Sequence, residues 1–90
     1  MQNQEYTNEL ESLFPAECHL KIVVENVRGV RERVETALLR FGVESPLTVG
    51  NLSAGGKYRT LNVSLTIEDR ETMFRLDNAL CEVDGVRMVM

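Results

Sequence analysis

The residues with the clearest chemical potential lie close together in the segment ENVRGVRER, residues 25–33. Asn26, Arg28, Gly29 and Arg33 combine an amide, two positive charges and a residue without a side chain. Glycine lets the backbone approach a ligand, and the free N–H groups at the start of a helix attract anions. The segment therefore indicates a binding site for a small anion. The same residues also suit an ordinary turn into a helix, with Asn26 as its N-terminal cap.

The charge balance limits the classes of partner. The net charge is −4, from 14 acidic and 10 basic residues, whereas a nucleic-acid surface needs a basic excess. No run approaches the ~18 apolar residues of a membrane span, and the first 14 residues lack the basic and apolar regions of a signal peptide. We therefore expect neither nucleic acid nor membrane as a partner, and we expect a cytoplasmic protein.

Cysteine and histidine are too sparse to predict a metal centre. Cys18 and Cys81 lie far apart in the sequence, and His19 is the only histidine. A zinc site or a disulfide framework needs more ligands at closer spacing. We expect two buried thiols in a reducing compartment, no metal and no cofactor.

The hydrophobic pattern alternates between strand and helix periods along the chain. A length of 90 residues and 43% hydrophobic residues predict one globular domain. Residues 1–14 are expected to be a flexible N-terminal segment and residues 15–90 the domain. Period-two stretches and helical stripes predict a strand over 18–25, a helix over 30–41, a strand over 46–52, a strand over 57–67, a helix over 70–83 and a strand over 86–90. Gly42 and Asp69 are expected to end the first helix and cap the second.

The order βαββαβ predicts an α+β, ferredoxin-like fold. Two helices with one apolar stripe each can cover only one face of a four-stranded antiparallel sheet. Thr60, Asn62, Ser64 and Thr66 are then expected on the uncovered face. The apolar positions that face the helices predict a core of Leu20, Ile22, Val24, Val34, Leu38, Phe41, Leu61, Val63, Leu65, Met73, Leu76, Leu80, Val86 and Met88.

Leu39, Phe74 and Cys81 fall outside the two helical stripes. The first interpretation is that the helices lie side by side and bury these flanks against each other. The second is that the flanks form a subunit interface. A homodimer is expected, through the uncovered sheet face, the edge strand that Pro46 opens, or these flanks.

Several motifs resemble the YbeD-like family of small bacterial proteins of unknown function. They are LFP before the first strand, the Gly56-x-Tyr58-x-Thr60 entrance to the polar strand GKYRTLNVSLTI, and the terminal GVRMVM. The resemblance covers the chain from Leu13 onward. It implies a ferredoxin-like fold similar to the ACT regulatory domain, and it implies no catalytic residues.

The segment ENVRGV, with Gly42-Val43 after the helix, also resembles the ACT domain itself. ACT modules have an Asp-x-x-Gly-Val turn between their first strand and first helix, and Asn26, Gly29 and Val30 match that pattern. Arg28 stands where ACT domains often have proline. This resemblance implies a non-catalytic regulatory or adaptor module that binds a partner protein or a small anionic metabolite through Asn26, Arg28, Gly29 and Arg33.

A resemblance to acylphosphatases supplies the enzymatic alternative. VRGVRER places Val27, Gly29, Val30 and Arg33 on their phosphate-binding loop, and LTVGN places Asn51 on their asparagine motif. By this resemblance Arg33 would bind phosphate and Asn51 would orient the attacking water. Arg28 and Glu32 replace the loop's glutamine and phenylalanine, which favours the non-catalytic interpretation.

Overall fold

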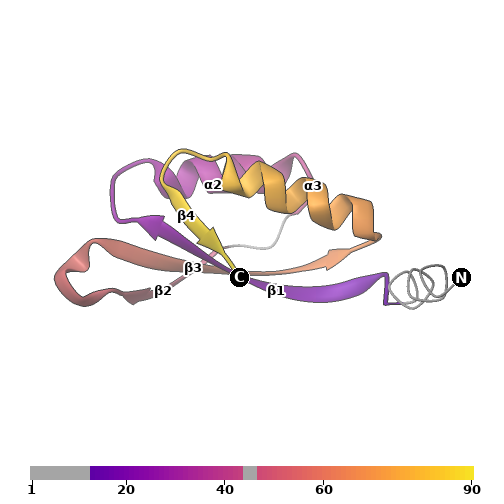
Figure 1. Ribbon diagram of the computed structural model, residues 1–90, viewed down its shortest axis with the longest axis horizontal. Coiled ribbons are helices and arrows are strands. Elements are labelled where there is room, and N and C mark those ends of the chain that lie inside the picture. Colours follow the sequence, from indigo (N-terminus) through magenta and orange to yellow (C-terminus); the bar gives the residue numbers. More distant parts are fainter. Residues whose placement is uncertain (1–12, 44–46) are drawn as a thin grey trace, which may run out of the picture.

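A four-stranded antiparallel sheet forms one layer of the computed structural model, which describes residues 13–43 and 47–90 (Figure 1). Its strand order is β2-β3-β1-β4. The strands are β1 (Ala16–Glu25), β2 (Thr48–Leu52), β3 (Tyr58–Ile67) and β4 (Val86–Val89). The two long strands, β1 and β3, lie at the centre and pair along their whole lengths, from Ala16 opposite Ile67 to Glu25 opposite Tyr58.

Two helices form the second layer, on one face of the sheet (Figure 1). They are α2 (Val30–Leu39) and α3 (Arg70–Cys81), and a short 3₁₀ turn, η1 (Ala54–Gly56), joins β2 to β3. This confirms the predicted ferredoxin-like βαββαβ fold, with β2 at an edge of the sheet. Residues 1–12, which make up most of the expected N-terminal segment, and Pro46 lie outside the described residues.

Asp69 and Gly42 have the roles that the sequence predicted for them, at the start of α3 and after the end of α2. The carboxylate of Asp69 accepts a hydrogen bond of 2.7 Å from the backbone N–H of Thr72, which caps α3. Gly42 has a φ of +72°, and the N–H of Val43 reaches back to the carbonyl of Leu38 at 3.2 Å. This left-handed glycine ends the helical turns after α2 and brings Val43 into the core.

Most of the predicted core is confirmed, but Met88 is wrong. The buried predicted residues are Ile22, Val24, Val34, Leu38, Leu61, Val63, Leu65, Leu76 and Leu80, with Leu20, Phe41, Met73 and Val86 packed partly buried against them. Met88 is 52% exposed. The cause is a β-bulge at Arg87: Val86 pairs with Val24, whereas Met88 pairs with Val23. The additional residue reverses the alternation, so that Val89 packs against the core and Met88 faces the open side of the sheet.

The expectation that the helices bury their flanks against each other is also wrong. Leu39 and Phe74 are 64% and 55% exposed, and Cys81 is exposed. The flanks that face each other carry Ala37 and Ala79, which line the groove between the helices. Because these side chains are small, the helices lie side by side through them. The larger side chains of Leu39 and Phe74 therefore remain on the surface.

The uncovered face of the sheet carries the predicted polar residues of β3. Ser64 and Thr66 are exposed, and Thr60 and Asn62 are partly exposed. The imidazole of His19 lies 2.7 Å from the hydroxyl of its cross-strand neighbour Ser64. The polar pattern therefore reflects a solvated sheet face, on which His19 and Ser64 form a side-chain hydrogen bond across β1 and β3.

Candidate functional site

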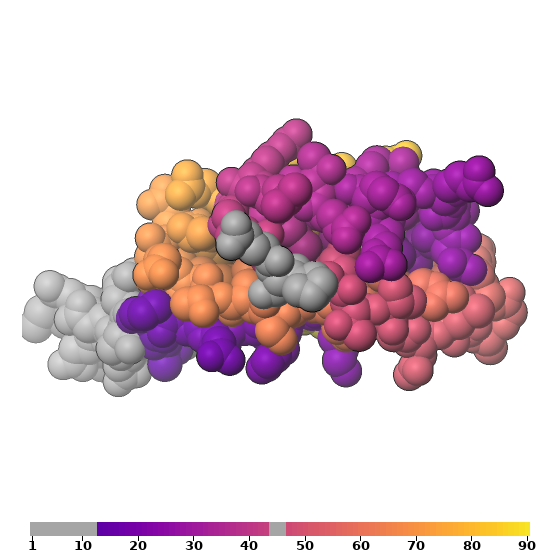
Figure 2. All heavy atoms as spheres, turned by 180° about the vertical axis from the view of Figure 1, so that it is seen from behind, coloured from indigo at the N-terminus to yellow at the C-terminus, as the bar shows by residue number. Residues whose placement is uncertain are grey.

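The turn between β1 and α2 lies directly above the tip of the β2–β3 hairpin. In Figure 2 the violet residues of this turn sit over the pink residues of the hairpin. The side-chain N–H of Asn26 donates to the carbonyl of Gly56 at 3.0 Å, and its backbone N–H donates to Lys57 at 2.9 Å. Asn26 therefore fastens the turn to the hairpin.

This role differs from the one the sequence predicted for Asn26. Asn26 does not cap α2. Its side-chain N–H donates to the carbonyl of Gly56, and its side-chain oxygen lies 3.5 Å from the guanidinium of Arg59. The N-cap position belongs to Gly29, with a φ of +91°, and no side chain of residues 13–43 or 47–90 caps the helix. The first-turn N–H groups of residues 30–32 consequently have no acceptor among the described residues, so none of these residues neutralises the partial positive charge of the helix start.

The structure brings Arg33 and Gly29 together. A methyl group built on Gly29 would lie 3.1 Å from Nη1 of Arg33, so the guanidinium folds back over the turn. Its Nε donates to the carbonyl of Asp84, at 3.2 Å, in the α3–β4 turn. Arg28 is exposed at the end of the turn. Asn26, Arg28, Gly29 and Arg33 thus share one end of the molecule, where two cations lie near an uncapped helix start.

Asn51 does not join this group. It is exposed on β2, at a bulge of the edge strand, and β3 separates β2 from β1. Neighbouring strands lie about 4.8 Å apart, so β2 is about 10 Å from β1. Arg33 turns the other way, toward the carbonyl of Asp84 next to β4. Among the described residues, no hydrogen bond joins Asn51 to Arg33, which instead donates to the carbonyl of Asp84.

Sequence reasoning missed the groove that continues from the turn between the two helices. This open groove of about 450 Å³ is lined by Arg33 and Glu32 from α2, by Arg40 directly after α2, and by Glu82 and Asp84 after α3, with small residues between them. The seven-residue spacing of Arg33 and Arg40 was the available signal, since it places both on one helix face. The carboxylates on the opposite wall make the groove electrostatically mixed.

Two described groups outside the turn have shifted pKa values. Hydrogen bonds from the backbone and side chain of Thr72 hold the pKa of Asp69 below 3.8, as expected of a helix cap. Partial desolvation, with the negative charge of Asp77, raises the pKa of the Cys81 thiol. A raised pKa lowers the fraction of the Cys81 thiol that is present as the reactive thiolate. Among the described residues, no three His, Cys, Asp or Glu side chains gather closely enough to hold a metal ion.

Comparisons with known proteins identify the fold and a family. A family model described as "Protein of unknown function (DUF493)" matches residues 9–90, in agreement with the YbeD-like resemblance. No curated protein matches this sequence significantly. No helix of the described part is long and apolar enough to cross a membrane.

Solved structures share the fold at low sequence identity. Protein HP0495 from H. pylori has a TM-score of 0.74 at 14% identity, covering 86% of this chain and 82% of its own. The ACT domain from GTP pyrophosphokinase of Chlorobium tepidum has a TM-score of 0.66 at 17% identity, covering 83% of each chain. The uncharacterized protein TM1266 from Thermotoga maritima has a TM-score of 0.59 at 21% identity, covering 83% of this chain and 96% of its own.

Proposed function

We propose that this chain, which belongs to the DUF493 family of proteins of unknown function, is a non-catalytic regulatory or adaptor module. The module binds a small anionic metabolite or a partner protein. The ACT-like fold supports a regulatory module. A domain of this fold occurs in a GTP pyrophosphokinase, where it is part of an enzyme chain. Of the two kinds of ligand, the geometry of the β1–α2 turn favours the anion.

The uncapped start of α2 is the observation that carries the proposal. No side chain among the described residues accepts from the N–H groups of its first turn, and a carboxylate or phosphate oxygen is the acceptor that such groups bind best. Gly29 adds no side chain to the turn, and the described group that lies closest to its Cβ position is the guanidinium of Arg33, at 3.1 Å. Arg28, exposed beside them, supplies a cation that can pair bidentately with the same anion.

The role of each residue in this proposal is distinct. Arg28 and the helix N–H groups contact the anion. Arg33 contributes positive charge while its Nε stays bound to Asp84. Asn26 acts indirectly, because its hydrogen bonds to the β2–β3 hairpin hold the turn in place. The carboxylate of Glu32 lies in the first turn of α2 and opposes a second negative charge, which favours small ligands over large polyanions.

A ligand screen with matched variants tests the proposal. The thermal midpoint of the protein is measured with inorganic phosphate and with di- and tricarboxylates, since a ligand at 100 times its Kd stabilises the native state by about 2.7 kcal/mol. Arg28→Ala is expected to abolish the shift. Arg40→Ala removes the same charge near the other end of α2 and is expected to keep it. No shift with any anion, or equal loss in both variants, refutes the anion site.

Hydrolysis of a generic acyl phosphate separates this proposal from the enzymatic alternative. We expect no turnover, because Arg28 and Glu32 replace two residues of the acylphosphatase loop and Arg33 already donates to the carbonyl of Asp84. Turnover that both Arg33→Ala and Asn51→Ala abolish would overturn the non-catalytic proposal and establish an acylphosphatase-like enzyme.

We also propose that the protein is a cytoplasmic homodimer. The exposed side chains of Phe74 and Met88 support self-association, since large apolar residues lie on both the helix flank and the sheet face. The free thiols of Cys18 and Cys81 support a reducing compartment. Light scattering over a wide concentration range tests the dimer, and a monomer throughout refutes it.

A further inference from the structure

The β4 side of β1 is only partly paired. β4 pairs with β1 at residues 22–24, and Met90 exchanges backbone hydrogen bonds with Lys21 at 2.8 and 3.0 Å. The N-terminal half of β1, residues 16–20, has no strand on this side among the described residues. This stretch is the free edge. It is bounded by Pro15, which has no N–H, and by the paired Lys21.

The direction of the backbone groups on the free edge follows from the paired half. Lys21 and Glu25 direct their N–H groups toward the β4 side, to Met90 and Gly85. Alternate residues of a strand point their N–H and carbonyl groups the same way. Glu17 and His19 therefore present their backbone donors and acceptors at the free edge, and the described residues supply no partner for them.

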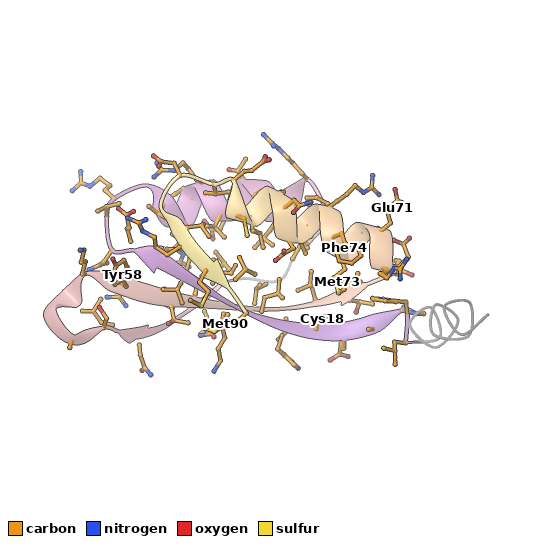
Figure 3. The ribbon with its side chains drawn as sticks, in the orientation of Figure 1. Cys18, Tyr58, Glu71, Met73, Phe74 and Met90 are labelled. Atoms are coloured by element: carbon orange, nitrogen blue, oxygen red, sulfur yellow. The ribbon has the colours of Figure 1, made fainter. Side chains whose placement is uncertain are left out.

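An apolar hollow overhangs this edge from α3. It has a volume of about 210 Å³, and its apolar lining includes Leu20, Met73, Phe74 and Met90. In Figure 3, Met73 and Phe74 lie on α3 above the strand that carries Cys18, with Met90 at the end of β4. A strand added at the free edge would place its helix-facing side chains beneath Phe74, which is 55% exposed.

We propose that a second copy of this chain occupies the free edge, through antiparallel pairing of β1 with the partner's β1 about a two-fold axis at Cys18. This inference rests on the proposed homodimer and not on the anion site. Cys18 is the middle residue of the stretch 16–20, so the two-fold pairing uses the whole free edge of both copies. It joins two four-stranded sheets into one continuous sheet, with the helices of both copies on the same face.

The sequence of the free edge is complementary to itself in this register. Glu17 lies opposite the partner's His19, and each such pair exchanges both backbone hydrogen bonds, because these are the residues with free groups. Their exposed side chains meet on the open face, where a carboxylate and an imidazole form a favourable cross-strand pair. On the helix face, Leu20 lies opposite the partner's Ala16. The pairing of Glu17 with His19 and the apolar row favour a second copy over an unrelated strand.

Cys18 provides a direct readout. Its own N–H and carbonyl groups point toward β3, so Cys18 and the partner's Cys18 form a non-hydrogen-bonded pair, with Cα atoms about 4.5 Å apart. A disulfide spans Cα separations of roughly 4.4–6.8 Å. In a Cys81→Ser background, mild copper–phenanthroline oxidation is therefore expected to link the dimer through Cys18.

Two variants at one position separate the backbone contribution from the rest. Glu17→Pro removes an N–H that the β1–β3 ladder does not use, so the fold is expected to remain while the dimer Kd rises at least tenfold and the Cys18 link is lost. Glu17→Ala keeps the N–H and is expected to raise the Kd less than Glu17→Pro does. Circular dichroism verifies the fold, and His19→Pro serves the same purpose if Glu17→Pro does not fold.

Each outcome of sedimentation and oxidation decides the proposal. A dimer that forms the Cys18 link and is lost in the proline variant supports it. A dimer that persists in that variant, without the link, overturns the proposed surface and leaves the homodimer intact. A monomer at all concentrations overturns both the proposed surface and the homodimer. If a photocrosslinker at Cys18 then captures a strand of another protein, that protein is the occupant of the free edge.

Discussion

Replacing Gly85 with alanine is expected to be among the most destabilising single-methyl changes in this chain. Gly85 has a φ of +99° in the turn between α3 and β4. A Cβ atom there would lie 2.6 Å from Cγ2 and 3.2 Å from Cγ1 of Val30, the first residue of α2. Val30 is only 1% exposed, and a valine in a helix has one strongly preferred rotamer, so it cannot move aside.

The expected cost has two parts. The left-handed backbone costs a non-glycine residue about 1–2 kcal/mol, and overpacking in a filled core costs about 1–3 kcal/mol. Gly85→Ala should therefore reduce the free energy of unfolding by about 3 kcal/mol. Gly42→Ala is the matched control, because Gly42 has a φ of +72° and a methyl group there meets nothing within 4 Å. It should show the backbone cost alone.

Urea unfolding of the two variants measures this difference. In a Val30→Ala background the clash is absent, so Gly85→Ala should cost about 1–3 kcal/mol less than it does in the wild type, a coupling typical of residues in contact. Equal costs for Gly85→Ala and Gly42→Ala, or no coupling to Val30, would refute the close packing of the α3–β4 turn on the start of α2.

Three further outcomes are expected. Val63→Asp should cost several kcal/mol more than Asn62→Asp in urea unfolding, because Val63 is 3% exposed and would bury an unpaired charge; similar costs would contradict the assignment of the two faces. The hydrogen bonds from Thr72 lower the pKa of Asp69. The contribution of the Asp69 carboxylate to the free energy of unfolding should therefore be present above pH 3.8 and be lost as the pH falls through the lowered pKa. A difference in unfolding free energy between the wild type and Asp69→Ala that does not shrink in acid would contradict this. Since its pKa is raised, Cys81 should react with iodoacetamide at pH 8 more slowly than a free cysteine, and an equal rate would contradict it.

The sequence predicted the fold well because its local and long-range signals agree. The alternation of β1 and β3 and the stripes of the two helices each specify one buried face, and only one arrangement satisfies all four. The roles of Asp69 and Gly42 could be predicted because an N-terminal cap and a left-handed glycine after a helix depend only on neighbouring residues in the sequence. The outcome for Met88 depended on a bulge at Arg87, and no local pattern shows which strand accommodates an additional residue.

The candidate site was predicted only in part. The sequence placed Arg28, Gly29 and Arg33 at a helix start, because all three lie within six consecutive residues. It predicted Asn26 as the cap of α2, whereas the side-chain N–H of Asn26 donates to the carbonyl of Gly56. That acceptor is 30 residues away in the sequence, so no local pattern indicates it. The exposure of Phe74 was missed for a similar reason: which flank of α3 faces α2 depends on how closely two separate helices pack, and the helical period does not contain that information.

Backbone amide chemical shifts during titration with a small anion test the central claim most directly. Residues 30–32 carry the N–H groups of the uncapped first turn of α2. If a carboxylate or phosphate binds there, their N–H resonances should show the largest and saturable shifts, which Arg28→Ala should remove and Arg40→Ala should leave unchanged. Shifts that are absent at these residues, or that concentrate near Arg40 at the far end of the groove, would contradict the claim.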